Sequence, residues 1–139
     1  MTQDNSVSFL SRLSMPQVAF DEVSFNRTGF RKGDDSEVEL EIGTGVRKIE
    51  DGRYDVSLSV TATKQDEYVA KVRITGYCKI DESTPHKTTI LEENAIAILF
   101  AYVRSELTLI TSQPETDPII LPVVNINEMI KQGKKHSDT

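Results

Sequence analysis

The side chains best suited to catalysis or metal binding are few and widely spaced in this chain. Its two histidines are His86, which follows Pro85, and His136, near the C-terminal end. No pair of histidines or cysteines has the spacing of a metal-binding motif, so the sequence predicts neither a metal site nor a cofactor. Cys78 is the only cysteine, and its place in an alternating segment favours a buried structural thiol over a nucleophile.

Two further patterns could indicate a binding site, but each has a simpler structural interpretation. The segment at residues 43–45, Gly-Thr-Gly, is not followed by the lysine and helix of a phosphate loop. Glu37, Glu39 and Glu41 share one face of a predicted strand. They could bind a cationic partner, but a solvated face partly paired with cations across the sheet is the simpler explanation. No acid–base pair is evident, so we do not expect an enzyme.

Length and composition are those of one globular domain. The 139 residues, 37% hydrophobic and 27% charged, can bury a core without disulfides. A net charge of −6 argues against general binding to nucleic acid or to anionic membranes. The longest apolar run, residues 95–103, is shorter than the roughly 18 residues that span a bilayer, and the N-terminus lacks a signal-peptide pattern. We therefore expect a cytoplasmic protein.

Four segments alternate apolar and polar residues, as strands that bury one face do. They cover residues 18–25, 37–42, 53–63 and 68–80. The first slips by one residue at Asp21-Glu22, as a β-bulge requires. Gly43, Gly45 and Asp51-Gly52 are interpreted as a connection after the second. Because no helix intervenes, the four segments predict an antiparallel sheet that is apolar on one face.

Two helices are predicted after the sheet. The first includes residues 94–110, with Thr89 as its N-cap and Glu92 completing a capping box, and should end before Pro114. A proline-rich extended segment leads to a short second helix, which Asn125 would cap. The predicted fold class is α+β, a four-stranded antiparallel sheet backed by one long helix plus a short C-terminal helix. We place the domain at residues 16–132, between an N-terminal extension (1–15) and a frayed tail (133–139).

The long helix is apolar on more than one side. A stripe that includes Leu99 and Val103 suits the apolar face of the sheet. Ile98, Tyr102 and Leu109 lie on another side, and leaving them in water would forgo roughly 1.5–3 kcal/mol each. We therefore expect a homo-oligomer, a dimer or tetramer, with these residues at its interface. The alternative is that residues 114–130 fold back and cover this flank within one chain.

Two stretches of the C-terminal half carry a resemblance to a known family. "ILFAYVR" at residues 98–104, followed by "LPVVNINEMI" at residues 121–130, resembles the SecB family of export chaperones. The four predicted strands also fall in the family's order, so the resemblance covers roughly residues 18–130. It implies a dimer of dimers assembled through the long helix. It also implies ATP-independent binding of nonnative polypeptides in apolar grooves.

The resemblance further implies site residues. Phe30, Tyr68 and Ile130 match positions near the peptide-binding grooves. For Tyr68 and Ile130 core packing is the simpler interpretation, whereas Phe30 lies in a polar loop and could line a groove. Export members dock on the translocase motor, SecA, through acids on the wet face of the sheet. Glu22 matches one such acid, but Lys71 stands where another is expected and argues against SecA docking. The alternative function is an interaction module that binds one dedicated partner, for instance in a toxin–antitoxin setting.

Overall fold

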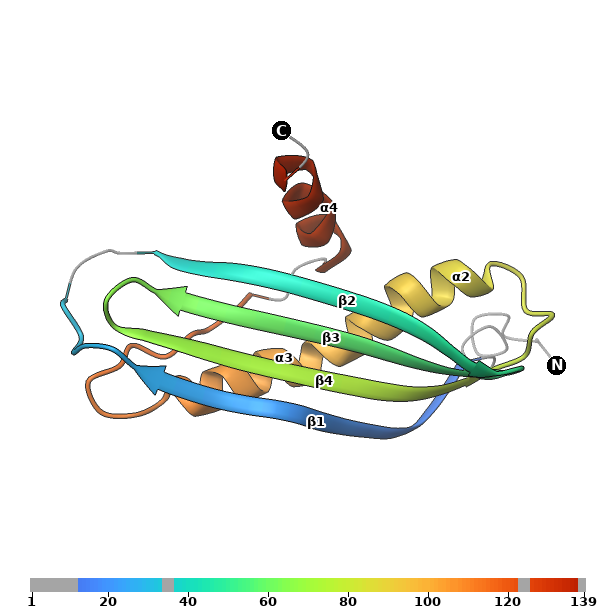
Figure 1. Cartoon of the computed structure of the whole chain (residues 1–139), viewed down its shortest axis with the longest axis horizontal. Coiled ribbons are helices and arrows are strands. Elements are labelled where there is room, and N and C mark those ends of the chain that lie inside the picture. Colours follow the sequence, from blue (N-terminus) through green and yellow to red (C-terminus); the bar gives the residue numbers. More distant parts are fainter. Residues whose placement is uncertain (1–12, 34–36, 123–125, 138–139) are drawn as a thin grey trace, which may run out of the picture.

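Four antiparallel strands form a single sheet in this chain, and the long helix crosses behind it (Figure 1). The structure, a computed structural model, describes residues 13–33, 37–122 and 126–137. The strands are β1 (Leu13–Arg27), β2 (Val38–Glu50), β3 (Arg53–Lys64) and β4 (Tyr68–Ile80). Their order across the sheet is β1-β4-β3-β2, so β1 and β2 are the edges. The predicted four-stranded antiparallel sheet backed by a long helix is confirmed.

The core lies between the inner face of the sheet and the long helix. Along the central strand β3, Val56, Leu58 and Val60 are buried, while the serines between them are half-buried on the outer face. The same alternation continues along β4, where Cys78 is buried as predicted. Buried and exposed residues alternate along a strand that buries one face, so both strands could be predicted from the sequence.

The predicted irregularity in β1 is confirmed. Phe20 pairs with Ile74 and Glu22 with Arg73, so the register shifts at Asp21, which is the signature of a β-bulge. A second shift, between Ser14 and Gln17, was not predicted. β1 begins at Leu13 and therefore includes residues that the sequence assigned to an N-terminal extension.

The prediction that β2 ends at Ile42 is wrong, because the strand continues through both glycines to Glu50. Gly43 pairs with Ser59, and Gly45 pairs with Ser57. A Cβ atom on Gly43 would lie 2.8 Å from the Ser59 hydroxyl oxygen, and one on Gly45 would lie 2.9 Å from that of Ser57. These glycines therefore mark close packing across a strand pair, not a connection.

The long helix starts earlier than predicted. Its parts are α2 (Lys87–Thr89), a π-type turn η1 (Ile90–Asn94) and α3 (Ala95–Thr111). His86, with a left-handed φ of 58°, precedes the first turn, and its carbonyl accepts a bond from Ile90 N at 3.0 Å. Thr89 has helical dihedrals and makes no side-chain cap, so the predicted capping box is wrong. The end of α3 at Thr111 agrees with the predicted end before Pro114.

The second helix, α4 (Ile126–Ser137), is confirmed, although it runs into the segment predicted as a frayed tail. The predicted cap, Asn125, lies outside the described residues. In Figure 1, α4 projects beyond the β2 edge of the sheet. This position separates it from β1, at the opposite edge.

The helical stretch Lys87–Thr111 is long and apolar enough to cross a membrane, with 25 residues and a hydropathy of 1.2. Its inner side, however, belongs to the protein core. The buried residues of α3 are Ala95, Ile96, Leu99, Phe100, Val103, Leu107 and Thr111. Burial of one side against a sheet is the arrangement of a core helix, and such helices reach the same length and hydropathy.

Candidate polypeptide-binding surfaces

The side of α3 that faces away from the sheet carries large exposed apolar residues. Ile98, Tyr102 and Leu109 are exposed to 44%, 47% and 68%. They follow one another at intervals of four and seven residues, which places them in one stripe along the helix. The three residues predicted to form an oligomer interface therefore share a single exposed surface.

The extended segment after α3 folds back along the helix, as the single-chain alternative proposed. Hydrogen bonds hold it there: Arg104 Nε to Leu121 O at 3.2 Å, Thr108 Oγ1 to Ile119 O at 2.6 Å, and Ile119 N to Thr111 Oγ1 at 2.8 Å. Ile119 is buried, but Ile120 is 78% exposed. Within the described part of the chain, the segment covers one flank of α3 and leaves the stripe of Ile98, Tyr102 and Leu109 open.

Phe30 lies in the loop after β1 and is 71% exposed. The backbone before it is fixed, because Thr28 N and Gly29 N both donate to Glu67 O, at 2.9 and 3.2 Å. A Cβ on Gly29 would meet the Asp66 carbonyl oxygen at 2.1 Å, so this close approach requires glycine. Phe30 is thus an exposed ring on an anchored loop.

Arg27 joins that loop to the segment after α3. Its guanidinium donates to the carbonyls of Gly29 and Glu115 at 3.1 Å and to that of Pro114 at 3.1 Å. Arg31, on the loop itself, forms an exposed ion pair of 3.3 Å with Asp117. These contacts attach the loop that carries Phe30 to the segment that carries Ile120, a residue the sequence analysis missed.

Tyr68 is a core residue in this structure. It is 1% exposed, and its ring stacks on Phe25 with a centroid distance of 5.1 Å. Burial raises the pKa of Tyr68, and the negative charges of Glu67 and Asp117 add to this effect. Of the two interpretations of Tyr68, core packing describes its position.

Ile130 lies far from Phe30 along the sheet. It is half-buried on α4, packs against the core, and lines a hollow of about 390 Å³ together with Val46 of β2 and Glu93 of η1. The Phe30 loop follows β1 and is bonded to the turn between β3 and β4, at the end of the sheet. The structure thus brings the Phe30 loop next to the turn before Tyr68, but it does not join Ile130 to them.

The two residues of the predicted docking face do meet. Lys71 Nζ lies 3.6 Å from Glu22 Oε1 on the outer face of the sheet, the face opposite α3. Glu22, which matches one docking acid of the family, is therefore paired with Lys71, which stands where a second docking acid is expected.

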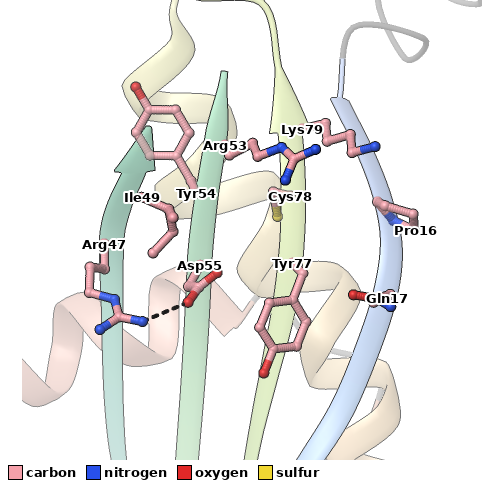
Figure 2. A pocket seen from close by; sticks show the side chains of 10 residues that line it. All are labelled: Pro16, Gln17, Arg47, Ile49, Arg53, Tyr54, Asp55, Tyr77, Cys78 and Lys79. Atoms are coloured by element: carbon pink, nitrogen blue, oxygen red, sulfur yellow. Dashed lines mark hydrogen bonds and ion pairs between the residues drawn. The ribbon is translucent and has the colours of Figure 1, made fainter. Parts of the chain in front are cut away.

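The outer face also has a hollow that the sequence analysis missed. It has a volume of about 340 Å³ and lies at the end of the sheet near the β2–β3 turn. Figure 2 shows Arg47, Asp55 and Tyr77 beside one another across β2, β3 and β4, with Arg53 and Lys79 nearer the end. Strand alternation already predicted that Arg53 and Lys79 face outward. Arg47 was missed because β2 was expected to end before it.

Cys78 lies beneath this hollow and is unsuited to nucleophilic chemistry. Its thiol is 2% exposed, and burial, with the charge of Asp55 adding to it, raises its pKa to about 11. A thiol with so high a pKa is protonated at neutral pH. Among residues 13–33, 37–122 and 126–137, no group of three or more histidine, cysteine, aspartate or glutamate side chains could hold a metal ion.

Comparison with known proteins identifies relatives over most of the chain. A family model described as preprotein translocase subunit SecB matches residues 7–137. The protein-export protein SecB of Neisseria gonorrhoeae is 27% identical over 112 residues, which is 76% of each chain. That of Dechloromonas aromatica is 30% identical over 108 residues, covering 74% of this chain and 71% of the relative.

A solved structure shares the fold. It is a SecB-like chaperone of Mycobacterium tuberculosis in complex with a peptide from an antitoxin. The TM-score is 0.65 at 12% sequence identity, and the match covers 85% of this chain and 91% of the other. At this identity the likeness concerns the arrangement of sheet and helices.

Proposed function

Because the chain belongs to the SecB family, whose members are chaperones, we propose that it binds nonnative polypeptides without ATP. The observation that carries this proposal is the exposed apolar surface on the helix side of the sheet. Phe30 and Ile120, on segments that contact each other, are each more than two-thirds exposed. Monomeric proteins rarely leave large apolar side chains in such numbers without a partner.

This surface suits extended and unrelated sequences. Phe30 and Ile120 project from segments that Arg27 and Arg31 tie together, so their backbones are held while their side chains stay free to adapt. An apolar and adaptable surface is what promiscuous binding requires. Burial of client side chains would contribute about 25 cal/mol per Å² of apolar area.

The stripe of Ile98, Tyr102 and Leu109 has a separate role in this proposal. Its intervals of four and seven residues allow two copies of α3 to pack against each other. We therefore expect a homo-oligomer, located in the cytoplasm, in which this stripe is buried and the Phe30 loop stays accessible. The family's chaperone character also agrees with a protein that is not an enzyme.

A module that binds one dedicated partner is the second candidate. Two observations favour it: the SecB-like chaperone that shares this fold binds an antitoxin peptide, and the docking acid Glu22 is paired with Lys71 here. Such a protein would keep the apolar surface but recognise a single segment. Docking on SecA is not required by either candidate.

An aggregation assay tests the proposal. Equimolar full-length protein should delay the light scattering of several unrelated, chemically denatured substrates as they are diluted into buffer. The delay should be the same with and without ATP. If the protein delays none of the substrates, the chaperone proposal fails and the dedicated-partner module becomes the better account.

A further inference from the structure

The outer face of the sheet, opposite the apolar surface, has its own shallow trough. The hollow of about 340 Å³ at the end of the sheet continues into a second one of about 410 Å³, and Arg47, Asp55 and Tyr77 line both. The floor of the second hollow includes Gly45 and Ser57. Small residues on the adjacent strands β2 and β3, with long ones around them, make the trough possible.

The trough is cationic in a chain that is acidic. Arg47, Arg53, Arg73 and Lys79 line it, against the two carboxylates Asp21 and Asp55. The balance is therefore +4 − 2 = +2, whereas the whole chain carries −6. Within the trough, positive charges therefore outnumber negative ones.

The two carboxylates of the trough are already engaged. Asp55 Oδ2 lies 2.9 Å from Arg47 Nη2, and Asp21 Oδ2 accepts a hydrogen bond of 2.5 Å from Thr75 Oγ1. Arg73 and Lys79, in contrast, have no carboxylate within ion-pair distance among the residues that the structure describes. Their charges are available to a partner.

Apolar side chains accompany these cations. Tyr77 is 37% exposed at the centre of the trough, and Ile49 is 50% exposed beside it. Ile49 lies two residues after Arg47 on β2, so strand alternation places both side chains on the outer face. A partner can therefore bury an aromatic or aliphatic side chain between its charged contacts.

The spread of the cations indicates the size of the partner. Arg73 and Lys79 are six residues apart on β4, which is about 20 Å at 3.3 Å per residue. A single phosphate or carboxylate cannot contact both. An extended peptide of about six residues can, because it has the same rise per residue.

We propose that this trough docks an acidic, extended polypeptide segment of a partner protein, with one large apolar side chain seated against Tyr77 and Ile49. Charge complementarity carries the choice, since Arg73 and Lys79 are unpaired and the lining is net positive. Nucleic acid is disfavoured because the chain as a whole is acidic and two carboxylates line the trough. This site is on the opposite face from the proposed client surface and does not depend on it.

Fluorescence anisotropy with a labelled octapeptide tests the proposal. The probe is rich in aspartate and glutamate with one central phenylalanine, and a matched peptide replaces each acid by its amide. Wild-type full-length protein should bind the acidic probe at least about tenfold more tightly than the amide probe. The affinity for the acidic probe should fall several-fold between about 50 and about 500 mM NaCl.

Variants locate the binding. Arg73→Glu with Lys79→Glu should weaken the acidic probe at least about tenfold, and Tyr77→Ser should weaken it several-fold. The matched control, Lys32→Glu with Lys131→Glu, makes the same change in net charge at exposed residues off this face, and should weaken binding less than about twofold. The first double variant should still delay substrate aggregation as the wild type does.

Three outcomes would overturn the proposal. One is that the acidic probe does not bind, or binds no better than its amide counterpart. Another is that the two double variants weaken binding equally, which would mean that net charge alone is sensed. The third is that a single-stranded oligonucleotide of equal length binds as tightly as the acidic peptide.

Discussion

Lys71 Nζ lies 3.6 Å from Glu22 Oε1, across the β1–β4 pairing on the outer face of the sheet. Both side chains are more than 40% exposed, so the pair adds little to stability. Its effect is on the surface charge, because an acid that could attract a cationic partner is matched by a neighbouring base.

This pairing predicts weak binding to the translocase motor SecA. Titration calorimetry should detect weak or absent binding by the wild type, compared with an export member of the family. Lys71→Glu should strengthen binding, since it removes the base and adds a second acid beside Glu22. Lys131→Glu, which makes the same change on α4, serves as the control. Tight, salt-sensitive binding by the wild type would show that this interpretation of the face is mistaken.

The open stripe on α3 predicts an oligomer. Ile98→Asp or Tyr102→Asp should give a folded species of lower mass, because a carboxylate cannot be buried in an apolar interface without a large penalty. Both side chains are exposed within one chain, so the protomer itself should stay folded. Ile49→Asp, the same change on the outer face, should keep the wild-type mass. Light scattering at micromolar concentration measures the masses, and a monomeric wild type contradicts the prediction.

Client binding should depend on Phe30 more than on Ile130. Phe30→Ser removes an exposed ring without disturbing the core and should shorten the delay of substrate aggregation. Combining it with Ile120→Ser, on the attached segment, should shorten the delay further. Ile130 lies beside β2 and packs against the core, so Ile130→Ser also weakens packing and its fold must be checked by circular dichroism. Equal delays for the wild type and the Phe30→Ser, Ile120→Ser variant would rule out this surface.

Tyr68 offers a test that separates packing from binding. Among the described residues nothing bonds to its buried hydroxyl, so Tyr68→Phe should leave the free energy of unfolding unchanged or raise it by up to about 1 kcal/mol. Tyr68→Ala should lower it by about 3–5 kcal/mol, because the ring stacks on Phe25. Urea denaturation gives both values. If Tyr68→Phe lowers the free energy of unfolding by more than about 1 kcal/mol, the hydroxyl makes a stabilising hydrogen bond and the prediction is wrong.

Glu82 predicts an acid dependence of stability. Its carboxylate accepts bonds from Lys87 Nζ at 2.6 Å, Gly52 N at 2.7 Å and the Tyr54 hydroxyl at 2.8 Å. These donors lower the pKa of Glu82 from 4.5 to about 2, with Lys87 the largest contributor. Because the folded pKa is the lower one, the contribution is complete above pH 4.5 and is lost as the pH falls towards 2.

Denaturation of Glu82→Gln from pH 7 to pH 2 checks this dependence. The variant should be less stable than the wild type at pH 7, and the difference should shrink below pH 4.5. Glu92→Gln, at an exposed position of η1, should follow the wild-type profile. A difference that stays constant over the whole range would mean that the network does not favour the ionised carboxylate.

The strands and the bulge that depend on hydrophobic periodicity could be predicted from the sequence. The features that depend on close contacts between residues distant in the sequence could not. The strands β3 and β4 and the bulge at Asp21 follow from alternation alone. Gly43 and Gly45 resembled a turn because the opposing serines, which explain them, are known only after β3 is paired. The helix start was missed for a similar reason: His86 adopts a left-handed conformation that is uncommon for residues other than glycine, and nothing nearby in sequence requires it.

The candidate sites show the same division. The exposed stripe of Ile98, Tyr102 and Leu109 was predictable from helical spacing, since the sheet can cover only one side of α3. The exposure of Ile120 was not, because it depends on hydrogen bonds from Thr108 and Thr111 that hold the neighbouring Ile119. The cationic trough was hidden because the full length of β2 was needed to bring Arg47 to it.

The order β1-β4-β3-β2 has a consequence for the time course of folding. β2, β3 and β4 follow one another through short turns, so they can form a meander from local contacts as soon as they leave the ribosome. β1 is synthesised first, yet its partner is β4, the last strand. β1, the first strand to be synthesised, is therefore the last to pair. Until it does, β4 has an open edge that another nascent chain can reach.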